Sequence, residues 1–168
     1  VKLFRQTIAL DPIHPQAYVF MGRALLSQGC ALEAAEAFRK ACHIRGSESE
    51  VYYDLGVAYQ KAGRMADAEH SFQDAVKHGY KAADLYRRLG DIQMEHLEKY
   101  EEAEASFTKA VRLEPQNVQA LFSLGLVALK LSKYKEAIRS FKDILAVDAD
   151  HTQAHYQLGF SYVKIEDF

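Results

Sequence analysis

The chain has 168 residues, enough for one ordinary domain or two small ones. Apolar residues make up 49% and charged residues 26%, as in an average soluble globular protein, so the composition excludes a disordered or fibrous chain. The 21 lysines and arginines are balanced by 23 aspartates and glutamates, and a net charge of −2 offers nucleic acid little attraction.

Two residue types recur at a nearly constant interval along the whole chain. Five glycines are spaced by 34, 34, 35 and 34 residues, and five phenylalanines are spaced by the same intervals. The residues are Gly22, Gly56, Gly90, Gly125 and Gly159, with Phe4, Phe38, Phe72, Phe107 and Phe141. Because both intervals lengthen together in the third unit, one extra residue lies between Gly90 and Phe107. The sequence therefore consists of repeated units.

Each unit is expected to contain two helices. Apolar residues around each glycine recur at intervals of three and four, which predicts an amphipathic helix. An alanine further along, four residues before each phenylalanine, belongs to a second apolar stripe and predicts a second helix. In chain order, the expected elements are a second helix over 1–14, repeats over 15–48, 49–82, 83–117 and 118–151, and a first helix over 152–168. All of them are expected to form one solenoid domain.

Helix ends are indicated by breakers and caps at matching places. Pro12 and Pro115 end second helices, and Gly46 and Gly79 do so in other units. Ser47 and Glu50 form a predicted capping box at the start of the following helix.

This pattern resembles the tetratricopeptide repeat, a helix-turn-helix unit. Residues 52–59, Tyr-Tyr-Asp-Leu-Gly-Val-Ala-Tyr, match its aromatic-x2-Leu-Gly-x2-Tyr signature, and Ala68 with Phe72 matches its Ala-x3-Phe signature. The resemblance covers the whole chain, with departures at Gln93 and at His155, which is expected to fill an aromatic core position. It implies an all-α fold, a right-handed α-solenoid whose first helices line a concave groove.

The recurring spacing has a packing reason. Glycine in the first helix and alanine in the second allow the two helices of a unit to approach closely. The phenylalanine is expected to fill the space between one unit and the next. Val1 begins inside a second helix and Phe168 ends a first helix. We therefore expect either a fragment of a longer protein or a chain that buries its ends by self-association.

No motif for catalysis is present in the sequence. It contains no phosphate-binding glycine loop, nucleophile elbow or paired cysteine motif, so we expect no enzyme activity and no cofactor. His151 and His155 are four residues apart, a spacing that allows two metal ligands on one helix face. Because no carboxylate or thiol pattern accompanies them, no metal site is expected, and His151 is expected to lie in a connecting loop.

In the resembling family, particular first-helix positions face the groove and contact ligands. Carried over, these are Val19, Arg23, Tyr53, Val57, Arg87, Arg88, Asp91, Phe122, Leu126, Leu129, Tyr156 and Phe160. The implied groove is charged in its middle and apolar toward its C-terminal end. Only Arg88 has a counterpart in the carboxylate clamp of the chaperone-cofactor subtype, and the asparagine ladder of the sugar-transferase subtype is absent.

The helix around Phe122 is expected to be apolar on all sides. Phe122, Leu126 and Leu129 add apolar side chains on the face turned toward the groove, and such a helix is normally buried. The cover would be a partner's peptide or helix, a second copy of the chain, or further repeats of the same protein. Alternatively, these are ordinary scattered exposed apolar residues.

Three arginines of the groove have two interpretations. They select an acidic segment of a ligand, or they form ion pairs with neighbouring carboxylates. The arginines are Arg23, Arg87 and Arg88, and the carboxylates are Glu50, Asp54, Asp84 and Asp91.

The sequence thus predicts a protein–protein interaction scaffold that binds a partner's peptide or helix in the groove. The alternatives are a self-assembling scaffold and a non-catalytic, substrate-recruiting module of a larger enzyme. Partners are expected to be proteins, with no nucleic acid and no membrane insertion, because the longest uncharged stretch, residues 116–129, is too short to span a bilayer. Cys30 and Cys42 fit no disulfide framework, which favours a cytoplasmic location.

Overall fold

The structure, a computed structural model, describes residues 1–44 and 48–166, for Glu166 the backbone only. Helices account for all the regular secondary structure of these residues, as expected from the sequence. They are α1 (Lys2–Leu10), α2 (Pro15–Ser27), α3 (Ala31–His43), α4 (Ser49–Lys61), α5 (Met65–Lys77), α6 (Ala83–Glu95), α7 (Tyr100–Leu113), α8 (Val118–Lys130), α9 (Tyr134–Val147) and α10 (Thr152–Glu166). The fold is all-α.

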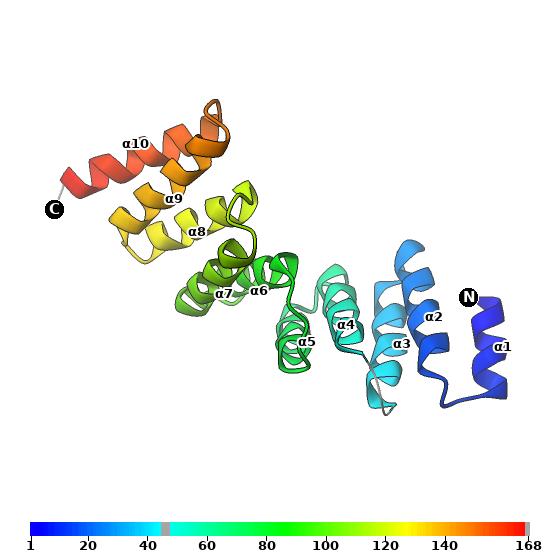
Figure 1. Cartoon of the computed structure of the whole chain (residues 1–168). Helices are drawn as coiled ribbons and strands as arrows, with labels where there is room; N and C mark the ends of the chain where they lie inside the picture. Colours follow the sequence, from blue (N-terminus) through cyan, green and yellow to red (C-terminus); the bar gives the residue numbers. More distant parts are fainter. Residues whose placement is uncertain (45–47, 167–168) are drawn as a thin grey trace. The chain divides into compact units, whose positions relative to one another are not determined.

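The helices group into two compact units, and consecutive helices pair within each (Figure 1). Unit 1, Val1–Lys81, contains α1 and the pairs α2–α3 and α4–α5. Unit 2, Ala82–Phe168, contains the pairs α6–α7 and α8–α9 together with α10.

Short turns join the two helices of each pair. They comprise residues 28–30, 62–64, 96–99 and 131–133, so the extra residue of the third unit lies in the turn 96–99. The second residue before each following helix has a positive φ: 79° at Gly29, 76° at Gly63, 53° at Glu98 and 57° at Ser132. The four turns therefore share one backbone conformation at this residue. Two of them place glycine there, which adopts it at no steric cost, and the other two place Glu98 and Ser132.

Within each pair, a phenylalanine of the second helix lies against a glycine of the first. A Cβ built on Gly22, Gly56, Gly90 or Gly125 would lie 2.7, 2.5, 2.6 or 2.6 Å from that ring. The corresponding side chains, Phe38, Phe72, Phe107 and Phe141, are completely buried. The close approach expected from the spacing is therefore present, but the ring contacts the glycine of its own pair rather than only filling space between units.

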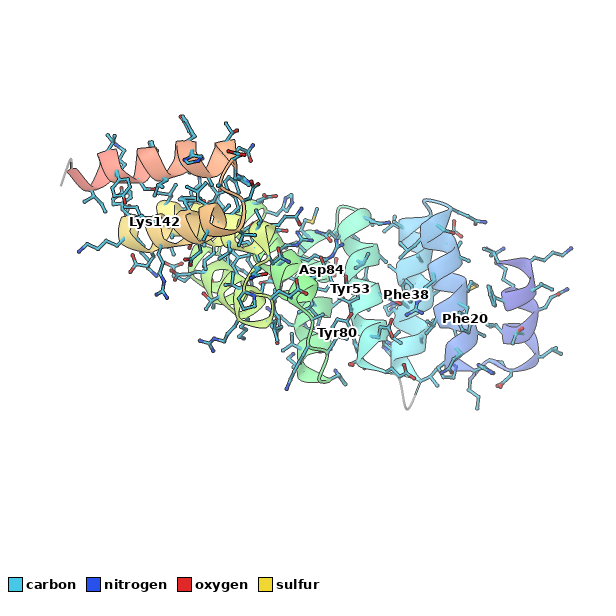
Figure 2. The ribbon with its side chains drawn as sticks, turned by 45° about the horizontal axis from the view of Figure 1, so that its top comes forward. Phe20, Phe38, Tyr53, Tyr80, Asp84 and Lys142 are labelled. Atoms are coloured by element: carbon cyan, nitrogen blue, oxygen red, sulfur yellow. The ribbon has the colours of Figure 1, made fainter. Side chains whose placement is uncertain are left out.

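The core of unit 1 also joins neighbouring pairs. Phe38, labelled in Figure 2, belongs to one buried cluster with Val51 and Leu55 of α4. Helix α1 contributes no buried residue. The ring of its Phe4 stacks on that of Phe20 in α2, with 6.0 Å between the ring centroids. The N-terminal helix is therefore held by a few partly buried contacts.

Unit 2 has a polar contact inside its core. Gln93, which departs from the aromatic pattern, is buried and accepts a hydrogen bond from the Ser106 hydroxyl at 2.8 Å. A buried polar group is tolerated when it is hydrogen-bonded, so this pair explains how the departure fits the fold.

The helix ends agree with the proline signals and only partly with the predicted caps. Helices α1 and α7 end two residues before Pro12 and Pro115. Gly46 and Ser47 lie outside the described residues, and the residue that caps the N-terminus of α4 is Glu48, whose side chain makes no capping hydrogen bond. At α8, the Asn117 side chain accepts the backbone N–H of Ala120 at 3.0 Å.

Candidate functional site

The predicted groove residues of unit 1 lie on the first helices of its two pairs. Val19 and Arg23 are four residues apart on α2, and Tyr53 and Val57 are four apart on α4, so each pair shares a helix face. The side chains of Val19, Tyr53 and Val57 are half-buried, and that of Arg23 is exposed. These faces are accessible enough to contact another molecule.

Arg23 links α2 to α4 through two ion pairs. Its Nε lies 2.7 Å from Asp54 Oδ2, and its Nη2 lies 2.8 Å from Glu50 Oε1. The hydrogen bond to Asp54 is the main cause that raises the pKa of Arg23. The pKa of Asp54 is also raised, chiefly because the carboxylate is largely removed from water, and the guanidinium acts in the opposite direction. Arg23 is therefore occupied within the chain, as the ion-pair interpretation predicted.

Tyr53 is partly occupied by neighbouring rings. It stacks on Tyr80 (both labelled in Figure 2) with 4.9 Å between centroids. It also lies 5.7 Å from the ring of Phe72. These contacts hold the tyrosine on α4 in one orientation.

A hollow of about 220 Å³ lies between α2 and the start of α4. Its lining consists of Pro15, Gln16, Val19, Phe20, Arg23, Glu48, Glu50 and Val51, and we call it the α2–α4 hollow. Val19 and Arg23 were predicted site residues, whereas Phe20, Glu48 and Val51 were not. The hollow contains residues of two consecutive repeats, so positions considered one repeat at a time do not identify it.

The charged residues of unit 2 form a network on one helix. Arg87 bridges Asp84 at 2.7 Å and Asp91 at 2.8 Å, and Arg88 Nε lies 2.6 Å from Asp84 Oδ2. All four belong to α6 at spacings of three or four residues. Again the ion-pair interpretation holds, because both arginines already have carboxylate partners.

Asp91 is the most enclosed carboxylate of this network. Burial raises its pKa, and Arg87 together with a hydrogen bond from Ser123 acts in the opposite direction. The contact with Ser123 connects α6 to α8, so Asp91 has a role in packing the two first helices of unit 2.

The apolar face of α8 is partly covered within its own unit. Phe122, Leu126 and Leu129 are half-buried and pack against the buried cluster of their own unit. Phe122 lies 5.8 Å from the ring of Phe141 and 5.8 Å from that of His151. Neighbouring helices of the same unit therefore contact part of this face, and its cover by a partner, a second copy or further repeats stays a prediction.

The exposed aromatic residues of unit 2 are found on α10 instead. Tyr156 is 72% exposed and Phe160 is 42% exposed. Between them, a Cβ at Gly159 would meet no atom within 4 Å, in contrast to the other four glycines of the series. Tyr156 and Phe160 are therefore accessible on this face of α10.

The two histidines near α10 have structural contacts. His151 precedes the helix, and its Nδ1 accepts the backbone N–H of Ala154 at 3.1 Å. His155 lies 2.8 Å from the carbonyl oxygen of Ala149 and is exposed, so the expectation that it fills an aromatic core position is wrong. Among the described residues, no group of three or more potential metal ligands occurs.

The length and polarity of the helices bear on membrane insertion. Across residues 1–44 and 48–166, none of the helices has both the length and the apolar character needed to cross a bilayer.

The sequence matches a family of repeat proteins over most of its length. The family model, described as Tetratricopeptide repeat, matches residues 1–49, 53–117, 96–150 and 122–162. A curated relative, Protein O-mannosyl-transferase TMTC3 of Mus musculus, is 27% identical over 135 residues, which is 76% of this chain. The chain spans only 14% of that relative's length.

Solved structures with the same arrangement of helices include those of YrrB and MamA. The crystal structure of YrrB, described as a TPR protein with an unusual peptide-binding site, has a TM-score of 0.87 at 24% identity, covering 97% of this chain and 84% of YrrB. MamA has a TM-score of 0.83 at 21% identity, covering 90% of this chain and 82% of MamA. At these identities, the likeness establishes the fold.

Proposed function

Because the chain belongs to the tetratricopeptide repeat family, we propose that it is an interaction scaffold that binds a peptide or helix of a partner protein through its first helices. The observation that carries this proposal is the accessible apolar and aromatic surface on those helices. It includes Val19 and Phe20 beside the α2–α4 hollow and Tyr156 and Phe160 on α10. Exposed apolar surface of this kind is typical of sites that contact other proteins.

The description of YrrB as a peptide-binding repeat protein supports a peptide as the partner's contacting element. Three arginines of the predicted groove are neutralised by carboxylates of the chain, so apolar contact supplies most of the binding energy in this proposal. The repeats themselves are proposed to act without catalysis. The free thiols of Cys30 and Cys42 support a cytoplasmic location.

The test is a quantitative comparison of partners captured from cell extract. We expect Tyr156→Ala combined with Phe160→Ala to reduce capture of specific partners at least fivefold. These side chains are exposed, so the variant should keep the wild-type helicity and melting temperature. Phe122 and Leu126 are unsuitable for this test, because their contacts with the core mean that polar substitution would unfold α8.

Leu32→Ala provides the matched control, since Leu32 is 55% exposed but belongs to the second helix α3. If the folded double variant captured the same partners in the same amounts as the wild type, the binding role of this surface would be disproved.

Self-assembly is a second candidate function, and the exposed Tyr156 and Phe160 of α10 favour it. Helix α1 contains no buried residue, and its Phe4 stacks on Phe20, so α1 of another copy would be a suitable occupant of this aromatic face. Light scattering over a concentration series would then give a mass that rises with concentration in the wild type and stays constant in Phe4→Ala. A wild-type mass that never changes contradicts this candidate.

The similarity to a segment of TMTC3 favours a third candidate, a substrate-recruiting module of a larger enzyme. In that case the repeats bind the substrate and a different part of the protein performs the reaction. A recruiting role requires that deletion of the repeats raises KM for a protein substrate and leaves activity on a small acceptor unchanged. Equal effects on both substrates would contradict it.

A further inference from the structure

The α2–α4 hollow has an apolar floor and a preordered wall. Val51 at its base is only 6% exposed, and Val19 beside it is half-buried. Phe20, labelled in Figure 2, is 49% exposed, yet one side of its ring is held by the stack on Phe4. A ligand that contacts this wall has little side-chain freedom to remove, which favours binding.

The charge around the hollow is negative. Among the lining residues that the structure describes, Arg23 is the only cation, and both of its carboxylate contacts, Glu50 and Asp54, belong to the chain. Glu48 is exposed and makes no ion pair within the described residues. These three carboxylates outnumber the one guanidinium by two charges, so an incoming anion is repelled and an incoming cation is attracted.

The volume of the hollow indicates whether it suits a small-molecule ligand or a side chain of a longer segment. Pockets for drug-sized ligands enclose about 300–1,000 Å³, whereas this hollow encloses about 220 Å³. It is also bordered by the open face of α2, along which a chain could continue. Its dimensions therefore suit one or two side chains of a longer segment.

We propose that the α2–α4 hollow binds a lysine or arginine of a partner peptide together with an adjacent apolar residue. The apolar side chain lies on Val19, Phe20 and Val51. The cation lies beside Glu48 and the outer side of Glu50. Arg23 takes no carboxylate from the ligand, because doing so would break an ion pair at 2.7 or 2.8 Å. This inference rests on the proposed scaffold function and specifies the chemistry of its ligand.

The experiment uses the whole chain and an immobilised peptide library in which one position beside a constant leucine is varied. We expect the wild type to retain peptides with Lys or Arg at that position at least threefold more than peptides with Asp or Glu. Salt at 0.5 M should reduce the difference, since exposed charges are then strongly screened. The preference for basic residues should disappear in Glu48→Lys, because two cations then balance the two remaining carboxylates, Glu50 and Asp54, around the hollow.

Two variants complete the design. Phe20→Ala should lower retention of all peptides while the protein remains folded by circular dichroism. Glu102→Lys, an equal charge change at an exposed residue of α7, should keep the wild-type preference. Equal retention of basic and acidic peptides, or a preference for acidic ones, overturns the proposal, as does retention of none.

The outcome is separable from that of the scaffold proposal. If partner capture depends on Tyr156 and Phe160 while the library shows no basic preference, the scaffold function stands and the inference about the hollow fails. If neither partner nor peptide is retained, both fail.

Discussion

At the residue scale, the glycines of the repeat series have two different environments. Gly56 lies under the ring of Phe72, so a methyl group would come within 2.5 Å of it. Gly159 has open space at the same position of its helix. The same substitution should therefore have opposite effects on stability at the two sites.

We predict that Gly56→Ala lowers the free energy of unfolding by about 1–3 kcal/mol, because the ring must shift in a packed core. Gly159→Ala should raise it by up to about 1 kcal/mol, since alanine favours the helix and meets no neighbour. Urea titrations followed by circular dichroism measure both values, with Gly22→Ala as a second buried example. Equal destabilisation at positions 56 and 159 would contradict the packing described here.

The thiol of Cys42 gives a prediction about pH. Burial raises its pKa from 9.0 to about 12, with a smaller contribution from Asp74. The folded state therefore retains a proton that the unfolded state loses. The associated stability is complete below pH 9.0 and is lost as the pH rises toward 12.

We expect iodoacetamide to alkylate Cys42 slowly at pH 10 in the folded protein and rapidly in urea, because the thiolate is the reactive form. Between pH 8 and 10.5 the native rate should keep increasing, whereas the rate in urea should level off. Peptide mapping by mass spectrometry follows this cysteine separately from Cys30. Identical pH profiles in the two states would show that its pKa is not raised by folding.

Sequence patterns do not show which distant group a side chain contacts. The predicted capping box includes Ser47, which lies outside the described residues, whereas the carboxylate of Glu50 pairs with Arg23 of another helix. His155 occupies an aromatic position of the repeat, yet it bonds to the Ala149 carbonyl and stays exposed. Local patterns in the sequence record the helix register, but they do not record which distant group offers a better partner.

At the element scale, few helix starts have a side-chain cap. The side chain of Asn117 at α8 accepts a backbone N–H, whereas Lys133 at α9 provides no such hydrogen bond. Helix α8 therefore depends on one polar contact in addition to its packing.

We predict that Asn117→Ala lowers the free energy of unfolding by about 1 kcal/mol, the usual effect of removing an N-cap. Lys133→Ala provides a comparison at an N-cap position without such a bond, although it also removes an ion pair with Glu104. Thermal unfolding with Asn117→Ser, which restores the cap, should return most of the loss. A serine variant as unstable as the alanine variant would assign the effect to another cause.

The helix pairs themselves were predictable because the glycine–phenylalanine spacing reflects a direct contact. The extra residue of the third unit was placed between Gly90 and Phe107, and it lies in the turn 96–99. The exposure of the α8 face was not predictable in the same way. It depends on how far His151 and the neighbouring helices cover Phe122. The repeat spacing of the sequence carries no information about that coverage.

At the scale of the whole molecule, stability should be graded along the chain. Repeat proteins depend on contacts between adjacent elements, so helices with few buried residues open first. Helix α1 contains no buried residue, whereas α3 contains five, among them Phe38.

Hydrogen exchange measured by mass spectrometry should therefore show the fastest exchange in α1 and slow exchange in α3. Within unit 2, α7 with the buried Phe107 should exchange more slowly than α10, in which Ala154 and Ser161 are buried. Uniform protection along the chain would instead indicate that each unit opens as a single cooperative body.

The contact of each phenylalanine with a glycine of its own pair has a consequence for how such a gene can change length. Duplication or loss of a complete repeat preserves every one of these contacts, because both partners travel together. A residue gained within a helix would rotate the ring by about 100° away from its glycine. A residue gained between the helices, as in the turn 96–99, leaves the contact between Gly90 and Phe107 in place. Natural variation in length should accordingly accumulate between helices and in multiples of whole repeats.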